Sequence, residues 1–138
     1  MVAAGVDGAQ MMIEKALSID PTGAYYHADL GNWAPNRKVD VVHSMEVVYY
    51  LYDPKGFVAN VHKNWLKENG RLIVGLDFYK ENTVSLSWPE DCGVSIMQLL
   101  PEATWIGFFK DAGFSNVQSW RVDVKENWAG TLVITAVK

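Results

Sequence analysis

Residues 65–74, WLKENGRLIV, join an expected helix to an expected strand and decide the fold class. Upstream, apolar residues recur at helical spacing from Phe57 to Trp65. Downstream, residues 71–78 contain an apolar run that is too continuous for a half-exposed strand, which is typical of a strand buried on both faces. Asn69-Gly70 between them predicts the end of the helix, because glycine readily takes positive φ.

The same alternation of strand and helix patterns extends in both directions along the chain. Strands are expected at 2–6, 24–27, 39–44, 117–124 and 131–137, and helices at 9–18 and 101–113. Residues 45–51 fit a strand or a helix, and residues 80–100 are expected to form a long loop with one helical turn. This order predicts an α/β domain with a mainly parallel sheet that ends in a C-terminal antiparallel hairpin.

Composition limits the class of protein. The 138 residues fit one domain spanning 1–138, and 49% hydrophobic residues are ordinary for a globular chain. A net charge of -4 disfavours nucleic acid and anionic membranes as partners. The single cysteine, Cys92, cannot form an internal disulfide, and the three histidines are too far apart in sequence to suggest a metal site. With no signal peptide or membrane-spanning segment recognisable, a cytoplasmic location is expected.

Several motifs in order resemble the class I S-adenosylmethionine-dependent methyltransferases from their second strand onward. The segment 5–16, GVDGAQMMIEKA, resembles the second strand, its acidic tip and the following helix. The segment 28–33, ADLGNW, resembles the next loop, and 39–51, VDVVHSMEVVYYL, the fourth strand and its continuation. Residues 65–74 and Ala112-Gly113-Phe114 are also similar to family features. The resemblance implies a Rossmann-like methyltransferase fold and S-adenosylmethionine as cofactor.

One family feature is missing from the sequence. The family's first strand ends in a loop resembling Gly-x-Gly-x-Gly, and no such run occurs here. In the family topology that strand lies in the middle of the sheet, so its absence leaves backbone donors and acceptors unpaired. We therefore expect one of two arrangements: the remaining strands pair differently, or a second copy supplies a strand, as in strand exchange. On this ground the sequence predicts a homodimer. That the chain is a fragment of a longer product is a further alternative.

The resemblance implies that the cofactor contacts lie after three strands. These residues are Asp7, Gly8, Asp29, Leu30, Ser44 and Met45. An acidic side chain at the position of Asp7 can accept hydrogen bonds from ribose hydroxyls, and Asp29 occupies the position that contacts the adenine amino group in the family. The alternatives are structural, since Asp7 also fits a helix cap and Asp29 a turn.

An acceptor pocket is expected from residues near the strand ends and in the long loop. Its candidates are Glu46, Tyr49, Tyr79, Trp88 and Trp105. Aromatic walls suit methyl transfer, which depends mostly on positioning and on exclusion of water, although each tryptophan also fits an ordinary core. His43 is a weak candidate for a general base, because a histidine at a strand end is more often simply packed.

Two functional hypotheses follow. The first is an enzyme that transfers a methyl group from S-adenosylmethionine to an unknown small acceptor. The second is a methyltransferase-derived domain without catalysis, which acts by homodimerisation or by binding a ligand or protein. The missing glycine-rich loop is the feature that discriminates between the two hypotheses. Its loss weakens the enzyme hypothesis, because a fold alone does not establish a function.

Overall fold

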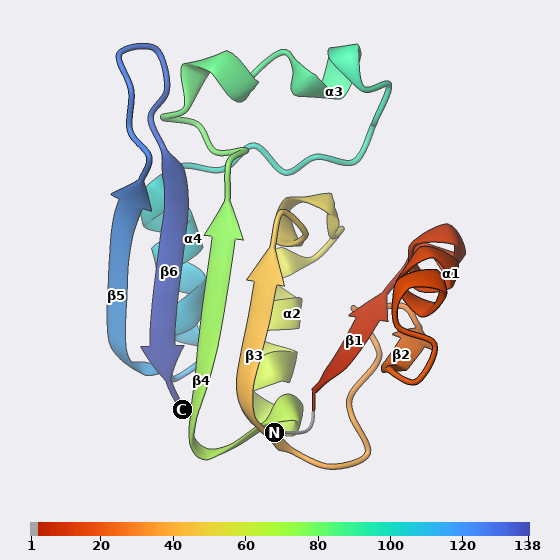
Figure 1. Ribbon diagram of the computed structural model, residues 1–138. Helices are drawn as coiled ribbons and strands as arrows, with labels where there is room; N and C mark the ends of the chain where they lie inside the picture. Colours follow the sequence, from red (N-terminus) through yellow and green to blue (C-terminus); the bar gives the residue numbers. More distant parts are fainter. Residues whose placement is uncertain (1–2) are drawn as a thin grey trace. The chain divides into compact units, whose positions relative to one another are not determined.

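The computed structural model describes residues 3–138, which divide between Ala34 and Pro35 into two compact units. The first unit is a parallel pair of strands with one helix (Figure 1). Its elements are β1 (Ala4–Asp7), α1 (Gln10–Ile19) and β2 (Ala24–His27). The expected strand, helix and strand are confirmed here, except that Val2 lies outside the described residues.

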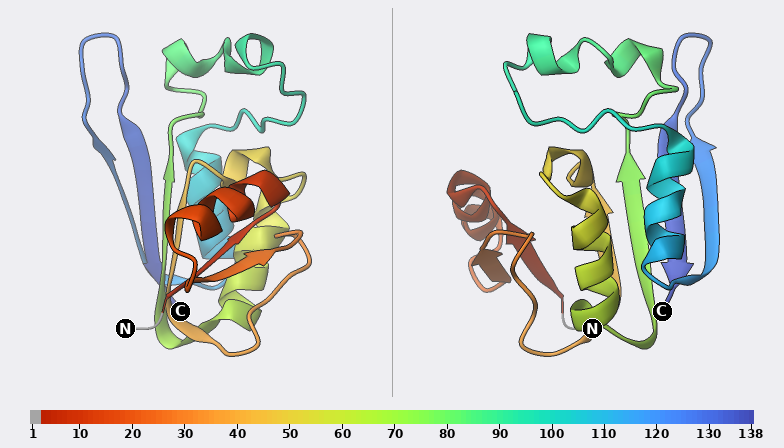
Figure 2. Two further views of the ribbon diagram at one scale, coloured as in Figure 1. Left: turned by 45° about the vertical axis from the view of Figure 1, so that its right-hand side comes forward. Right: turned by 180° about the vertical axis from the view of Figure 1, so that it is seen from behind.

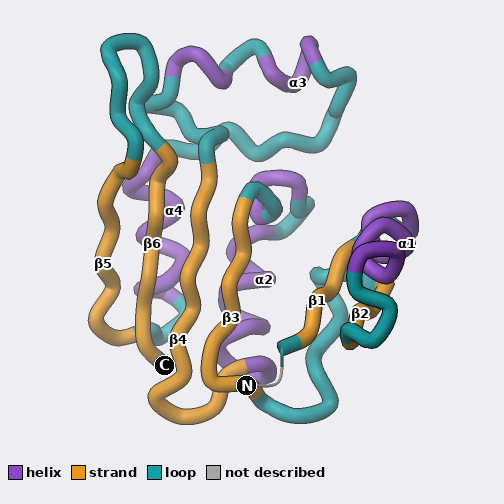
Figure 3. Tube along the Cα trace, in the orientation of Figure 1, coloured by secondary structure: helices purple, strands orange, loops and turns teal. Residues whose placement is uncertain are grey.

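The second unit contains one four-stranded sheet and its helices (Figures 1 and 3). Its strands are β3 (Val39–Met45), β4 (Leu66–Leu76), β5 (Ser115–Val122) and β6 (Thr131–Val137). Its helices are η1 (Val48–Tyr50), α2 (Pro54–Asn60), η2 (Val61–Trp65), η3 (Thr83–Ser85), α3 (Trp88–Asp91) and α4 (Glu102–Asp111).

The larger sheet is mixed, with strand order β3-β4-β6-β5. β3 pairs with β4 in parallel, whereas β4 with β6 and β5 with β6 are antiparallel. The predicted α/β class and C-terminal antiparallel hairpin are therefore confirmed. Because β1 pairs with β2 in a separate parallel sheet, parallel and antiparallel pairings are equal in number among the described residues.

The core of the second unit lies between its sheet and the helices α2 and α4. Both helices cover the same face of the sheet, as the view from behind shows (Figure 2). Strand residues that point to this face are sealed from solvent, for example Leu72, Leu76 and Ile134 at 0% exposure. Aromatic side chains of the helices close the layer, with Phe57 against Trp65 and Trp105 against Phe108.

The helix before β4 ends earlier than the sequence predicts. α2 continues as the π-helix η2 only to Trp65, and the strand already begins at Leu66. Asn69 rather than Gly70 takes positive φ, at 63°, within the strand. A side chain at Gly70 would lie 2.8 Å from the carbonyl oxygen of Lys67, so the glycine is needed for close backbone approach and does not end a helix.

Backbone hydrogen bonds hold the two ends of the segment 80–100 in place. The backbone N–H of Lys80 donates to the carbonyl of Leu100 at 3.1 Å, and that of Gln98 donates to the carbonyl of Tyr49 at 2.8 Å. Two short helices, η3 and α3, replace the single helical turn that was expected. Residues 45–51, left open by the sequence, form the end of β3 and the 3-10 helix η1.

Membrane-spanning helices and metal-binding clusters are both absent from the described residues. No helix in residues 3–138 has the length and apolar character needed to cross a membrane. Within the same residues, no group of three or more histidine, cysteine or acidic side chains is placed to hold a metal ion.

Candidate functional site

The carboxyl ends of β1 and β2 bring part of the expected cofactor site together in the first unit. Asp7 pairs in register with His27, and the N–H of Ala28 donates to the carbonyl of Asp7 at 3.0 Å. Asp7 and Asp29 therefore follow neighbouring parallel strands at one edge, where open α/β sheets bind ligands. His27 Nε2 lies 3.1 Å from the carbonyl oxygen of Gly8 and ties the two loops together.

Both aspartates also hold their own loops. The N–H of Ala9 donates to Asp7 Oδ1 at 2.7 Å, so Asp7 stabilises the turn that leads into α1. Asp29 accepts from the N–H of Gly31 with Oδ1 and from the Asn32 amide with Oδ2. A carboxylate oxygen can accept more than one hydrogen bond. These turns therefore hold the two carboxylates in position and leave them able to accept further hydrogen bonds. The structural and the ligand-binding roles are compatible.

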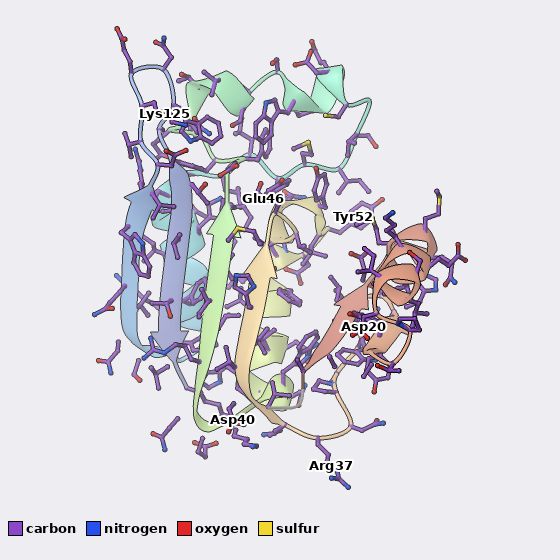
Figure 4. All side chains as sticks on the ribbon, in the orientation of Figure 1. Asp20, Arg37, Asp40, Glu46, Tyr52 and Lys125 are labelled. Carbon is purple, nitrogen blue, oxygen red and sulfur yellow. The ribbon has the colours of Figure 1, made fainter. Side chains whose placement is uncertain are left out.

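A half-buried carboxylate stands at the carboxyl end of β3 in the second unit. Glu46 follows Met45 directly, takes positive φ at 56°, and lies at the upper end of the strand (Figure 4). The Tyr49 hydroxyl donates to Glu46 Oε2 at 2.8 Å, and the Tyr49 side chain is itself only 2% exposed. Glu46 Oε1 is buried and has no hydrogen-bond partner among the described residues.

Asp77 is the second carboxylate at this edge. It follows β4, which pairs with β3 through Met45 and Gly75, so the two acidic residues leave neighbouring strands near the same point. Asp77 Oδ1 is also buried without a partner in the described part of the chain. Sequence reasoning missed Asp77, because it falls inside the apolar segment 71–78 that was expected as one strand. The change from apolar Leu76 to an acid was the available signal.

The surroundings of Glu46 shift the pKa of its carboxyl group. Burial raises the pKa of Glu46, and the nearby Asp77 carboxylate raises it further, whereas the hydrogen bond from Tyr49 acts in the opposite direction. Burial and the same hydrogen bond raise the pKa of the Tyr49 phenol, so this hydroxyl remains a donor at neutral pH. A shifted pKa at the end of a strand marks Glu46 as a candidate functional residue.

Replacing Tyr49 with phenylalanine is expected to raise the pKa of Glu46 further. The substitution removes the hydrogen bond that stabilises the carboxylate and keeps the ring that packs against Phe78. Carboxyl carbon NMR titration of the two proteins measures the change. Because the pKa of Glu46 is raised on folding, its ionisation destabilises the fold as the pH rises above 4.5 through the folded-state pKa.

Tyr52→Phe is the matched control for this titration, since its side chain is 82% exposed. An unchanged Glu46 titration in Tyr49→Phe would contradict the assigned hydrogen bond.

The remaining expected pocket residues are dispersed. Tyr79 and Trp105 are buried, and the Tyr79 hydroxyl donates to the carbonyl of Gly130 at 2.8 Å. Trp88 stacks on Trp128 with ring centroids 6.3 Å apart. Burial favours a core role for Tyr79 and Trp105, and for Trp105 this is the alternative that the sequence left open. Glu46 and Tyr49 are the pair that the structure brings together.

The residues of β3 differ in their surroundings. His43 is exposed and lies within the strand, two residues before its end, so it remains a prediction without support from a neighbouring group. Ser44 is half-buried and Met45 is 45% exposed. A side chain at Gly75 would lie 2.4 Å from Met45 Sδ, so the glycine makes room for this methionine at the strand ends. Leu30, beside Asp29 in the first unit, is buried.

Comparison with known proteins decides the family. The family model described as "Methyltransferase domain" matches residues 2–119. The chain belongs to this methyltransferase domain family. No curated protein matches the chain. The structural comparisons agree on the fold, as three solved proteins show.

The first is a protein in complex with the Haloferax volcanii Trm112 methyltransferase activator, with 24% identity and a TM-score of 0.82. The second is the N-methyltransferase NodS of Bradyrhizobium japonicum WM9 in complex with S-adenosyl-L-homocysteine, with 15% identity and a TM-score of 0.76. The third is an S-adenosylmethionine-dependent methyltransferase of Mesorhizobium loti, with 14% identity and a TM-score of 0.80.

The three alignments use almost all of this methyltransferase domain but not all of its neighbours. Each covers 99% of this chain, and they cover 71%, 66% and 80% of the three neighbours in the same order. At these identities the likeness shows the fold, and residue roles do not transfer through it. The recognition of a Rossmann-like methyltransferase domain is confirmed.

Proposed function

We propose that this methyltransferase domain binds S-adenosylmethionine and methylates the nitrogen of a small amine. The observation that carries the acceptor class is the carboxyl pair Glu46 and Asp77 at the ends of neighbouring parallel strands, each with a buried oxygen that has no hydrogen-bond partner within residues 3–138. An ammonium group supplies the donors that such oxygens need. The neighbour NodS, by its description an N-methyltransferase, supports the same chemistry.

The cofactor side of the proposal rests on the first unit. Asp7 and Asp29 fit as acceptors for hydroxyl and amino groups, because each is held by its turn at the carboxyl ends of β1 and β2. S-Adenosylmethionine supplies a methyl group on a sulfonium. The sequence has no Gly-x-Gly-x-Gly run to approach its methionine part.

Glu46 has a specific role in this proposal. Its ionised carboxylate attracts the protonated amine and is the acceptor for the proton that the nitrogen loses before it takes the methyl group, as the bond between that methyl group and the cofactor sulfur breaks and S-adenosyl-L-homocysteine leaves. Tyr49 holds Oε2 and leaves Oε1 for the acceptor. Tyr49 and Asp77 are positioning and binding groups, respectively, in this scheme.

A panel of amines and matched alcohols, assayed for methyl transfer from labelled S-adenosylmethionine, tests the acceptor class. We expect turnover with amines, and we expect Glu46→Gln to raise KM by roughly tenfold or more, because a charge-assisted hydrogen bond contributes about 1.5–3 kcal/mol. Glu90→Gln is the control, as Glu90 lies in the exposed part of α3. Turnover with alcohols alone would contradict the amine proposal. Cofactor binding without turnover of any acceptor would favour the non-catalytic alternative.

We also infer a homodimer in a reducing cytoplasm. β3 pairs only with β4, and β1 only with β2, so each of the two sheets presents an open edge within the described residues. The unpaired backbone N–H and C=O groups of an edge strand can pair with a strand of another chain. Strand exchange is one route to such a dimer. Cys92 is exposed and free, which suits a reducing compartment. An activator protein is an alternative partner, as in the Trm112 complex of one neighbour.

A further inference from the structure

One aromatic side chain next to the carboxyl pair is open to solvent. Tyr50 is the last residue of η1, and its side chain is 42% exposed, whereas that of Tyr49 is 2% exposed. The two rings lie 4.5 Å apart between centroids and are tilted by 48°. Tyr50 therefore presents an aromatic surface to solvent beside the tyrosine whose hydroxyl donates to Glu46.

The backbone of η1 fixes where the Tyr50 ring stands. The N–H of Tyr50 donates to the carbonyl of Val47 at 3.0 Å, and the carbonyl of Tyr49 accepts from the N–H of Gln98 at 2.8 Å. Val48 and Tyr49 are buried, so the protein side of η1 is anchored in the core. The ring is thus held next to the carboxyl pair by an ordered element.

The two members of the carboxyl pair act on one another. Burial is the main cause of the raised pKa of Glu46; the Asp77 carboxylate raises it further, and a hydrogen bond from the Asp77 backbone lowers it. The Glu46 carboxyl group therefore lies close to Asp77. Glu46 Oε1 and Asp77 Oδ1 are both buried without a hydrogen-bond partner within residues 3–138. Two such oxygens require two N–H donors.

The number of N–H donors depends on how many carbon groups an amine carries. A protonated primary amine has three N–H groups, a secondary amine has two, and a tertiary amine has one. A secondary amine can give one donor to each member of the carboxyl pair. The third N–H of a primary amine would meet the ring of Tyr50, which is a weak acceptor, and a tertiary amine would leave one oxygen without a donor.

The Tyr50 ring suits the carbon groups of such an amine. The face of an aromatic ring attracts a cation that lies within about 6 Å of its centroid, and alkylated ammonium groups are recognised in this way. The carboxyl pair and the ring therefore complement two different parts of one protonated secondary amine.

We propose that the acceptor is a secondary amine and that Tyr50 is a specificity-determining residue of its site. The two N–H groups bind Glu46 Oε1 and Asp77 Oδ1, and a carbon substituent on the nitrogen lies on the Tyr50 ring. Glu46 takes one proton, and the nitrogen lone pair then bonds to the methyl carbon as the bond from that carbon to the cofactor sulfur breaks. The product is a protonated tertiary amine, which keeps one N–H for Asp77. This inference rests on the proposed N-methylation and narrows its acceptor.

Matched primary, secondary and tertiary forms of one amine test this inference: benzylamine, N-methylbenzylamine and N,N-dimethylbenzylamine. Methyl transfer from labelled S-adenosylmethionine gives kcat and KM for each. Calorimetric titration of each amine into protein saturated with S-adenosyl-L-homocysteine gives Kd independently of turnover.

Three variants accompany this series. Tyr50→Leu removes the ring, and Tyr50→Phe keeps the ring and removes the hydroxyl. Tyr52→Leu is the control, because Tyr52 is 82% exposed and lies beyond the end of η1. Circular dichroism establishes that each variant is folded.

We expect kcat/KM of the wild type for N-methylbenzylamine to exceed that for each of the other two amines by about fivefold or more, because each of them mismatches one hydrogen-bonding group. Tyr50→Leu is expected to raise KM and Kd for N-methylbenzylamine by roughly 3- to 30-fold with little change in kcat, the size of effect of a lost cation–π contact. Tyr50→Phe and Tyr52→Leu are expected to behave as the wild type.

Two results would overturn the inference and leave N-methylation intact. The first is a kcat/KM for benzylamine or N,N-dimethylbenzylamine that equals or exceeds that for N-methylbenzylamine. The second is an unchanged KM and Kd in Tyr50→Leu. Methylation of none of the three amines by a protein that turns over other primary amines would also overturn it. Turnover of no amine at all would contradict the inference together with the proposed function.

Discussion

Replacing Asn82 with alanine is expected to lower the free energy of unfolding by about 2–4 kcal/mol. The Asn82 side chain is 0% exposed and bonds in two directions: its Nδ2 donates to the carbonyl of Asp77 at 2.8 Å, and its Oδ1 accepts from the N–H of Ala129 at 3.2 Å. Alanine leaves both backbone groups without a partner in a buried place. Chemical denaturation of the two proteins measures the loss.

This asparagine connects the candidate site to the rest of the second unit. It joins the end of β4, where Asp77 stands, to the turn before β6. Asn127→Ala is the matched control, because Asn127 is exposed in the same turn and its loss is expected to cost less than about 0.5 kcal/mol. Equal stability of Asn82→Ala and wild type would contradict the buried network.

The second large effect is expected on cofactor affinity. Asp7→Ala is predicted to weaken binding of S-adenosyl-L-homocysteine by about 10- to 100-fold, because a hydrogen bond to a carboxylate contributes about 1.5–3 kcal/mol. Asp29→Ala is predicted to weaken it in the same direction. Calorimetric titration measures both.

Asp20→Ala is the control for the structural role of Asp7 in its turn. Asp20 also holds a turn in the first unit, through the N–H and hydroxyl of Thr22, but it lies at the end of α1 and before β2 rather than after a strand. Its substitution is expected to leave the affinity unchanged. If Asp7→Ala and Asp20→Ala behaved alike, Asp7 would be a turn residue only.

Much of the fold was predictable from sequence because its signals are local. Apolar runs predicted β2 and β6 at their observed positions, and the helical spacing around Trp105 predicted α4. The junction at residues 65–74 was predicted less well. The π-helix η2 and the early start of β4 at Leu66 depend on tertiary packing of Trp65 and Leu66, which are both buried.

The candidate site was predictable only in part, because it depends on strand register. Sequence grouped Glu46 and Tyr49 as pocket candidates, which stays a prediction, and the structure joins the two by a hydrogen bond. It did not identify Asp77, which comes near Glu46 only because Met45 pairs with Gly75.

We propose that this methyltransferase domain retains a working cofactor site without a glycine-rich loop. Calorimetric titration of the wild-type protein with S-adenosyl-L-homocysteine tests it most directly, with circular dichroism to establish that the sample is folded. We predict binding with a dissociation constant in the micromolar range. The absence of heat at millimolar ligand from a folded sample would contradict the claim and leave a domain that acts through its surfaces alone.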